Sequence, residues 1–132
     1  MLEETEVLYK NLKIKLHTTP NYLEVLIDDT NFSDQKNYIT SVSILLELAL
    51  TIHPQYIILN KLHSTFKIAR ELYAFTERSI IDPLKNDGVK KIICLAMADE
   101  VINHYQQVEL IEPFIKGFSS KEEALIWMTE NS

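Results

Sequence analysis

The segment Val89–Ala98 limits the folds open to this chain more than any other segment does. Its apolar residues run without interruption from Ile92 to Met97. A strand with one face in water alternates apolar and polar residues, whereas a strand covered on both faces forms a continuous apolar run. We therefore expect this segment to be the central strand of a sheet whose two faces are both covered.

Four further segments have the pattern of strands. Leu12–His17 alternates lysine with aliphatic residues, and the turn Thr18–Asn21 leads from it into the more apolar Tyr22–Asp28. Because the connection is so short, these first two strands are predicted to form an antiparallel hairpin. Tyr56–Asn60 and Phe114–Phe118 are the other two predicted strands.

Helical spacing of apolar residues fills most of the sequence between these strands. A long helix is predicted between Asp34 and His53, a second from Phe66 to about Ile81, and a third from Asp99 to about Glu109. Asp82, with a proline after it, is predicted to cap one further turn that Gly88 ends.

The C-terminal segment carries two overlapping helix-start signals. Ser119 is followed three residues later by Glu122, and Ser120 by Glu123. In such a capping box the hydroxyl accepts a hydrogen bond from an N–H of the first turn, and the carboxylate favours the positive end of the helix. The helix that follows should dock on the sheet, with Trp127 as a packing anchor, through the apolar residues Ala124, Leu125, Trp127 and Met128.

The resulting order of elements is β-β-α-β-α-β-α-β-α. This alternation is typical of an α/β fold, here with a mainly parallel, five-stranded mixed sheet. No internal repeat or shift in composition divides the chain, so residues 1–132 are expected to form a single domain.

Composition excludes several classes of function. The formal net charge of −6 argues against nucleic-acid binding, which needs clustered lysine and arginine. The longest apolar stretch contains Glu47 and is about fifteen residues long, shorter than the roughly twenty that a membrane span needs. The lone cysteine, Cys94, cannot form an intrachain disulfide and suits a reducing compartment, so we expect a cytoplasmic protein.

The histidines do not have the spacing of metal ligands. No pair of them follows a pattern that would place two imidazoles on one ion, so neither a metal nor another cofactor is expected. The four histidines are His17, His53, His63 and His104.

Two local signatures resemble the STAS-type domains, and most closely their SpoIIAA-like branch of small bacterial proteins, which is similar to CRAL-TRIO-type lipid-binding domains. The first signature is Ile80–Ile92, a helix end that leads through Gly-Val-Lys into a strand. The second is Phe118–Trp127, similar to the closing Phe-x-x-x-x-Glu-Ala-x-x-Trp helix of the family. The resemblance implies a sheet wound in one direction, with most helices on one side. It also implies a non-catalytic regulatory module that acts through protein–protein interaction, as anti-sigma-factor antagonists do.

One segment departs from the family pattern. In regulatory STAS proteins a phosphorylated serine follows the third strand, in an Asp-Ser-Ser/Thr-Gly-like segment. Here Ser64 and Thr65 occupy that place, but the acid and the glycine are missing. The resemblance makes Ser64 and Thr65 candidate phosphoacceptors, whereas a simple N-cap explains the same two residue types.

Polar residues collect at the predicted carboxyl ends of the strands, which is where parallel α/β sheets usually bind ligands. Polar residues of the same types are also common in loops and helix caps. Nothing in the sequence fixes the geometry that an acid–base site would need. An enzyme is therefore the least favoured reading. The candidate strand-end residues are Asp28, Asp29, Asn60, His63, Asp99 and Glu100.

The first long helix is apolar over a wider arc than one sheet-facing side requires, because Ile44 and Leu48 lie off its main stripe. Three explanations stay open. Packing within the chain covers these residues, or a second copy buries them in a homodimer, or a small apolar or lipid-like ligand occupies the groove.

Overall fold

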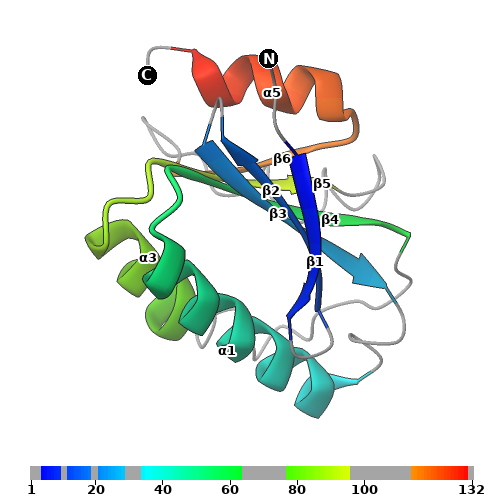
Figure 1. Cartoon of the computed structure of the whole chain (residues 1–132), viewed down its shortest axis with the longest axis vertical. Coiled ribbons are helices and arrows are strands. Elements are labelled where there is room, and N and C mark those ends of the chain that lie inside the picture. Colours follow the sequence, from blue (N-terminus) through cyan, green and yellow to red (C-terminus); the bar gives the residue numbers. More distant parts are fainter. Residues whose placement is uncertain are drawn as a thin grey trace.

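The protein is built around one mixed sheet of six strands, which follow one another across the sheet in the order of the sequence (Figure 1). This computed structural model describes residues 4–9, 12–18, 21–28, 34–63, 77–95 and 114–130. The strands are β1 (Glu4–Tyr9), β2 (Leu12–Thr18), β3 (Asn21–Asp28), β4 (Tyr56–His63), β5 (Lys91–Leu95) and β6 (Ile115–Phe118).

The sheet has an antiparallel and a parallel half. Strands β1, β2 and β3 pair antiparallel, and β3, β4, β5 and β6 pair parallel. The α/β class and the mainly parallel mixed sheet are confirmed, and all five predicted strands are present. Strand β1 is a sixth, which sequence analysis missed because its few apolar residues lie among glutamates at one edge of the sheet.

Strand β5 is buried on both faces, as its apolar sequence predicts. It lies between β4 and β6, and residues Ile92 to Leu95 are at most 1% exposed. Alternate residues face opposite layers: Ile92 belongs to the apolar cluster under one set of helices, and Ile93 to the cluster on the opposite face. Both faces of the strand are therefore buried, as a continuous apolar run requires.

One face of the sheet carries α1 (Gln35–Ile52), the π-helical turn η1 (Glu77–Ile81) and α3 (Asp82–Asn86). Asp34 starts α1, because its carboxylate accepts a hydrogen bond from the Asn37 amide at 2.7 Å. The core on this face joins the helices to β2, β3, β4 and β5 through Leu12, Ile14, Leu23, Val25, Ile27, Tyr38, Val42, Leu45, Leu48, Ala49, Ile57, Ile80, Leu84, Val89 and Ile92.

The opposite face is covered by the C-terminal helix α5 (Lys121–Thr129), which packs over β5 and β6 (Figure 1). Ser120 is its N-cap and accepts a hydrogen bond from the Glu123 amide at 3.4 Å, so of the two overlapping start signals the second is used. The smaller core beneath α5 consists of Tyr22, Tyr56, Ile58, Ile93, Leu95, Ala124 and Met128.

The predicted docking of α5 is confirmed, but its anchor differs from the one predicted. Ala124 and Met128 are both fully buried, whereas Trp127 is only half-buried. Positions 124 and 128 lie one turn apart on the same side of a helix, and this side faces the sheet. Trp127 is rotated away from it, toward Phe118 at the margin of the sheet.

The start of α3 also differs from the prediction. Asp82 was expected to be the N-cap, but Ile81 holds that position with helical dihedral angles and no side-chain cap. The reason is that η1 runs directly into α3, so the chain is already helical when it reaches Asp82.

Two predicted helices are described in part or not at all. The helix expected from Phe66 is described only from Glu77 onward, where it has π-helical geometry. The helix expected from Asp99 to Glu109 lies outside the described residues. None of the helices in the described segments is long and apolar enough to cross a membrane.

Gly88 ends α3 with a φ of +100°, and a Cβ added there would meet nothing within 4 Å. We expect Gly88→Ala to lower the free energy of unfolding by about 1–2 kcal/mol, entirely through backbone strain. Urea denaturation measures this loss. Gly88→Asn is the matched control and should lose less, because asparagine tolerates positive φ better than alanine does. Equal losses in the two variants would contradict this explanation.

Candidate functional site

The backbone brings part of the predicted strand-end site together. Asp28 and His63 are register partners at the carboxyl ends of β3 and β4, and the register shifts between Leu26 and Asp28. A bulge of this kind is common beside functional sites, since it changes the direction of the side chains that follow. The remaining predicted residues of this region, Asp29, Ser64, Thr65, Asp99 and Glu100, lie outside the described residues.

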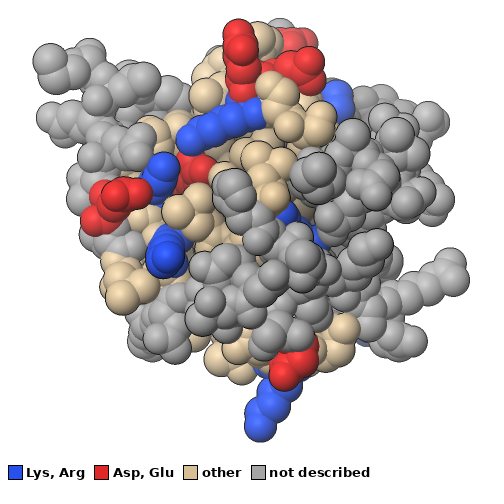
Figure 2. Space-filling view, turned by 90° about the vertical axis from the view of Figure 1, so that its right-hand side faces the viewer, with Lys and Arg blue, Asp and Glu red and all other residues tan. Residues whose placement is uncertain are grey.

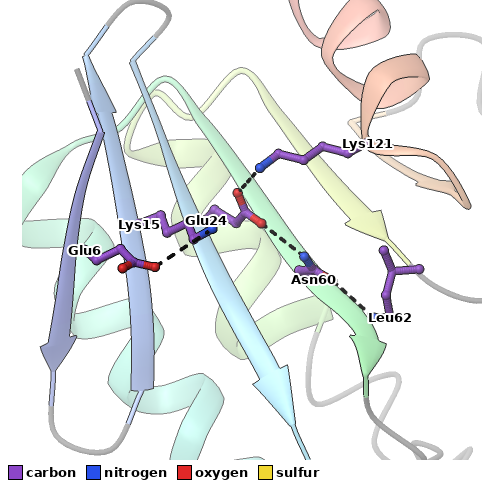
Figure 3. Close-up of polar contacts among 6 residues, drawn as sticks. All are labelled: Glu6, Lys15, Glu24, Asn60, Leu62 and Lys121. Carbon is purple, nitrogen blue, oxygen red and sulfur yellow. Dashed lines mark hydrogen bonds and ion pairs between the residues drawn. The ribbon is translucent and has the colours of Figure 1, made fainter. Parts of the chain in front are cut away.

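Asn60, the strand-end residue whose side chain is described, has two structural contacts (Figure 3). Its Oδ1 accepts a hydrogen bond from the Leu62 amide at 3.1 Å, and its Nδ2 donates to Glu24 Oε2 at 3.1 Å. The first contact supports the irregular end of β4, and the second ties β4 to β3. The amide of Asn60 thus holds the framework beside the predicted site.

Glu24 is a buried carboxylate at the centre of the sheet. It is 1% exposed, and its Oε1 accepts a hydrogen bond from Lys121 Nζ at 2.6 Å (Figure 3). Lys121 is the first residue of α5, and its side chain is 36% exposed. Both oxygens of Glu24 are therefore engaged by the framework, one by Lys121 at the start of α5 and one by Asn60 on β4.

A row of alternating charges extends from Glu24 across the antiparallel half of the sheet. Lys15 is the register partner of Glu24 on one side and of Glu6 on the other. Lys15 Nζ lies 3.9 Å from Glu6 Oε1, an ion pair at the exposed margin of the sheet. Figure 2 likewise shows positive and negative side chains interspersed on the face it presents, among the described residues.

Sequence analysis missed Glu24, although a signal for it exists. It is the lone charged residue between Tyr22 and Ile27, inside a strand otherwise fit for burial. A buried carboxylate needs a partner, because an uncompensated charge in the interior is costly. The sequence could thus have indicated that a partner is required, but not that Lys121 supplies it.

His53 and Asp87 form a second polar contact, which joins the ends of α1 and α3. His53 caps α1 in the left-handed conformation with φ 57°, and its Nδ1 lies 2.8 Å from Asp87 Oδ2. Asp87 is the C-cap of α3. The pair fixes two helix ends together at the edge where β4 and β5 begin, opposite the carboxyl ends of these strands.

His53→Ala is expected to lower the free energy of unfolding by about 1 kcal/mol, because alanine cannot contact Asp87 and adopts this left-handed φ less readily than histidine does. Thermal or urea unfolding gives the value. Asp87→Asn separates the two causes, since it removes the charge of the pair and leaves the backbone of His53 unchanged. If Asp87→Asn lowered the free energy of unfolding more than His53→Ala does, the backbone at position 53 would contribute nothing to the loss.

The other histidines and the cysteine fall in different places. His17 is buried and stacks on Tyr22 with 3.9 Å between the ring centroids, Cys94 is buried in β5, and His104 lies outside the described residues. Within the described segments, no group of three or more histidine, cysteine or acidic residues is arranged to hold a metal ion.

The two residues proposed as an interface on α1 pack largely within the chain. Leu48 is 8% exposed and belongs to the core under α1, and Ile44 is half-buried against the same core. Packing within the chain therefore accounts for most of the wide apolar arc. On α1 the large apolar residue that stays exposed is Leu50, at 39%.

A different surface, which we call the lysine–aromatic edge, lies along β6 and the adjoining ends of α3, β5 and α5. It consists of three lysines placed over three half-buried aromatic rings. Lys116 Nζ lies 5.4 Å from the Phe118 ring centroid and 5.8 Å from that of Trp127, and the two rings are 5.7 Å apart. The other two pairs are Lys91 over Trp127 at 4.6 Å and Lys85 over Phe114 at 5.6 Å.

The lysines of this edge differ in what holds them. Lys91 Nζ donates to the carbonyl oxygens of Trp127 at 2.6 Å and Glu130 at 2.8 Å, and so caps the C-terminal end of α5. Lys85 and Lys116 are exposed, and neither forms an ion pair with a carboxylate of the described residues. The edge is thus locally positive in a chain whose formal net charge is −6.

The fold and these surfaces define a small α/β protein with a consecutively ordered sheet, helices on both faces and a cationic, aromatic edge. Comparison with known proteins adds no family to this description, because no protein-family model, curated protein or solved structure matches the chain.

Proposed function

We propose that this protein is a non-catalytic, STAS-like binding module of the cytoplasm that acts through contact with a partner protein, in the manner of an anti-sigma-factor antagonist. The observation that carries the proposal is the lysine–aromatic edge. Aromatic side chains supply large contact area at low entropic cost, and charged groups around them speed association and select the partner.

The arrangement of the sheet supports the STAS-like part of the proposal. Strands β3 to β6 are parallel and consecutive, with α1 and α3 on the same face. The resemblance implies this one-directional winding. The C-terminal helix α5 then covers the second face, which such winding would leave open.

The proposal is tested by capture from a native lysate of the source cells, with the tagged chain as bait and mass spectrometry of the bound proteins. We expect one protein to be retained in stoichiometric amount, and to be released as salt is raised because charged contacts are screened. Native mass spectrometry of the purified chain is the companion measurement. Recovery of a bound lipid in place of any protein would favour a carrier and contradict the proposal.

A further inference from the structure

We propose that the outer edge of β6 receives an extended, acidic segment of the partner protein, which adds to the sheet as a further strand. This inference rests on the proposed function and names the chemistry of its partner. The free edge of a strand offers unpaired N–H and C=O groups, and adding a strand to such an edge is a recurring mode of peptide recognition.

Strand β6 has a second edge with which no strand of the described residues pairs. It is the last strand in the sheet order and, among the described residues, pairs only with β5. In a parallel ladder, half of the backbone groups of an edge strand point away from its neighbour. The Phe114 carbonyl faces β5, where it accepts a hydrogen bond from the Ile92 amide at 2.8 Å, so by alternation the N–H and C=O groups of Ile115 and Gly117 point away from β5.

The charges at β6 select an acidic strand. Lys116 is exposed at the middle of β6, and Lys85 lies over the ring of Phe114, the residue before β6. Each ammonium group rests on an aromatic ring, an electrostatic attraction that holds the side chain in place. Opposite charges on neighbouring strands attract when they face each other, so carboxylates on the added strand would meet Lys116.

The other edge of the sheet has the reverse character. Strand β1 forms that edge and carries Glu6, whose side chain is 71% exposed. An acidic segment would meet a like charge there, which disfavours pairing. The two edges therefore differ in sign, and an acidic strand has one edge that attracts it.

The side-chain pattern of β6 fits a strand that alternates acidic and branched apolar residues. Lys116 and Phe118 share the face of Ile93 and Leu95, while Ile115 and Gly117 share the opposite face. Acids on the first face would lie beside Lys116. Valines on the second would lie beside Ile115 and over Gly117, which has no side chain to obstruct them.

The same surface fits a single-stranded nucleic acid less well. Bases bind such proteins by stacking on aromatic faces along a positive groove. Here lysines already lie over the rings of Phe114, Phe118 and Trp127, and the chain as a whole is acidic. A peptide that pairs through its backbone needs neither a free ring face nor a basic protein.

The test uses the peptide (Glu-Val)4, acetylated and amidated, with the full chain. Trp127 is the chain's only tryptophan and lies at this edge, so its fluorescence reports binding directly, and calorimetry gives an independent Kd. We expect (Glu-Val)4 to bind and (Lys-Val)4 not to bind. Lys116→Glu should weaken binding by about tenfold or more, since an attraction becomes a repulsion.

Matched controls separate strand addition from simple charge attraction. Lys13→Glu makes the same charge change at an exposed position of β2 in the other half of the sheet, and should leave the affinity nearly unchanged. A (Glu-Val)4 peptide with alternate backbone amides N-methylated keeps every charge but cannot pair along one edge, and should lose binding. Circular dichroism checks that each variant is folded.

Several outcomes would overturn the inference. The inference fails if (Glu-Val)4 does not bind, or if the N-methylated peptide binds as tightly as the unmethylated one. It also fails if Lys13→Glu weakens binding as much as Lys116→Glu does, or if the oligonucleotide dT8 binds tightly and the peptide does not bind. Capture from lysate with wild-type and Lys116→Glu baits distinguishes this failure from that of the proposed function. A partner held equally by both baits leaves the binding module standing and refutes the β6 site, whereas no partner on either bait refutes the module itself.

Discussion

Lys121→Met is expected to lower the free energy of unfolding by about 3 kcal/mol, because it removes the ammonium group that hydrogen-bonds the buried carboxylate of Glu24 at 2.6 Å. Glu24 is 1% exposed, and its other hydrogen bond comes from the neutral amide of Asn60. Methionine keeps the length and apolar stem of the lysine, so the loss reports the charge and not the packing. Urea denaturation at neutral pH, followed by circular dichroism, measures it.

Replacing the other member of the pair, Glu24, should lower the free energy of unfolding by less. Glu24→Gln keeps the size of the side chain, and the Lys121 ammonium that it releases can reach water because that side chain is 36% exposed. We expect a loss of about 1 kcal/mol, the usual net worth of a hydrogen bond. The double variant completes a cycle that isolates the coupling between the two residues. A loss from Glu24→Gln as large as that from Lys121→Met would show that the buried charge is not the cause.

Local patterns in the sequence predicted most of the elements, because their signals lie within a few neighbouring residues. The apolar run of β5 and the serine cap at the start of α5 are of this kind. Strand β1 was missed because an edge strand needs few apolar residues, and so resembles a polar terminus. Its pairing with β2, rather than its own composition, makes it a strand.

The candidate sites were predicted less completely, since they depend on contacts between distant residues. Glu24 and Lys121 are 97 positions apart, and only the docking of α5 on the second face brings them together. The lysine–aromatic edge likewise combines residues of α3, β5, β6 and α5. Each lysine looks like an ordinary surface residue in the sequence. The parallel pairing of β5 with β6 and the docking of α5 bring Lys91 and Lys116 to one ring, that of Trp127.

The anchor of α5 gives the last prediction. Met128→Ala should lower the free energy of unfolding by about 3 kcal/mol, because it leaves a cavity in the small core beneath α5. Met128 is fully buried there together with Ala124, Ile93 and Leu95. Trp127→Ala should cost less, about 1–2 kcal/mol, although tryptophan is the larger side chain, since Trp127 is only half-buried beside Phe118.

Circular dichroism in urea is the appropriate measurement for this pair, because Trp127→Ala removes the only tryptophan. Hydrogen exchange adds a local measure. In Met128→Ala the amides of α5 should exchange faster than those of β5, because a helix without its anchor can detach while the sheet stays closed. A greater loss from Trp127→Ala than from Met128→Ala would place the anchor at Trp127 after all. It would also mean that α5 is rotated on the sheet relative to the arrangement in Figure 1, which would move Lys121 away from Glu24 and abolish the coupling expected between them.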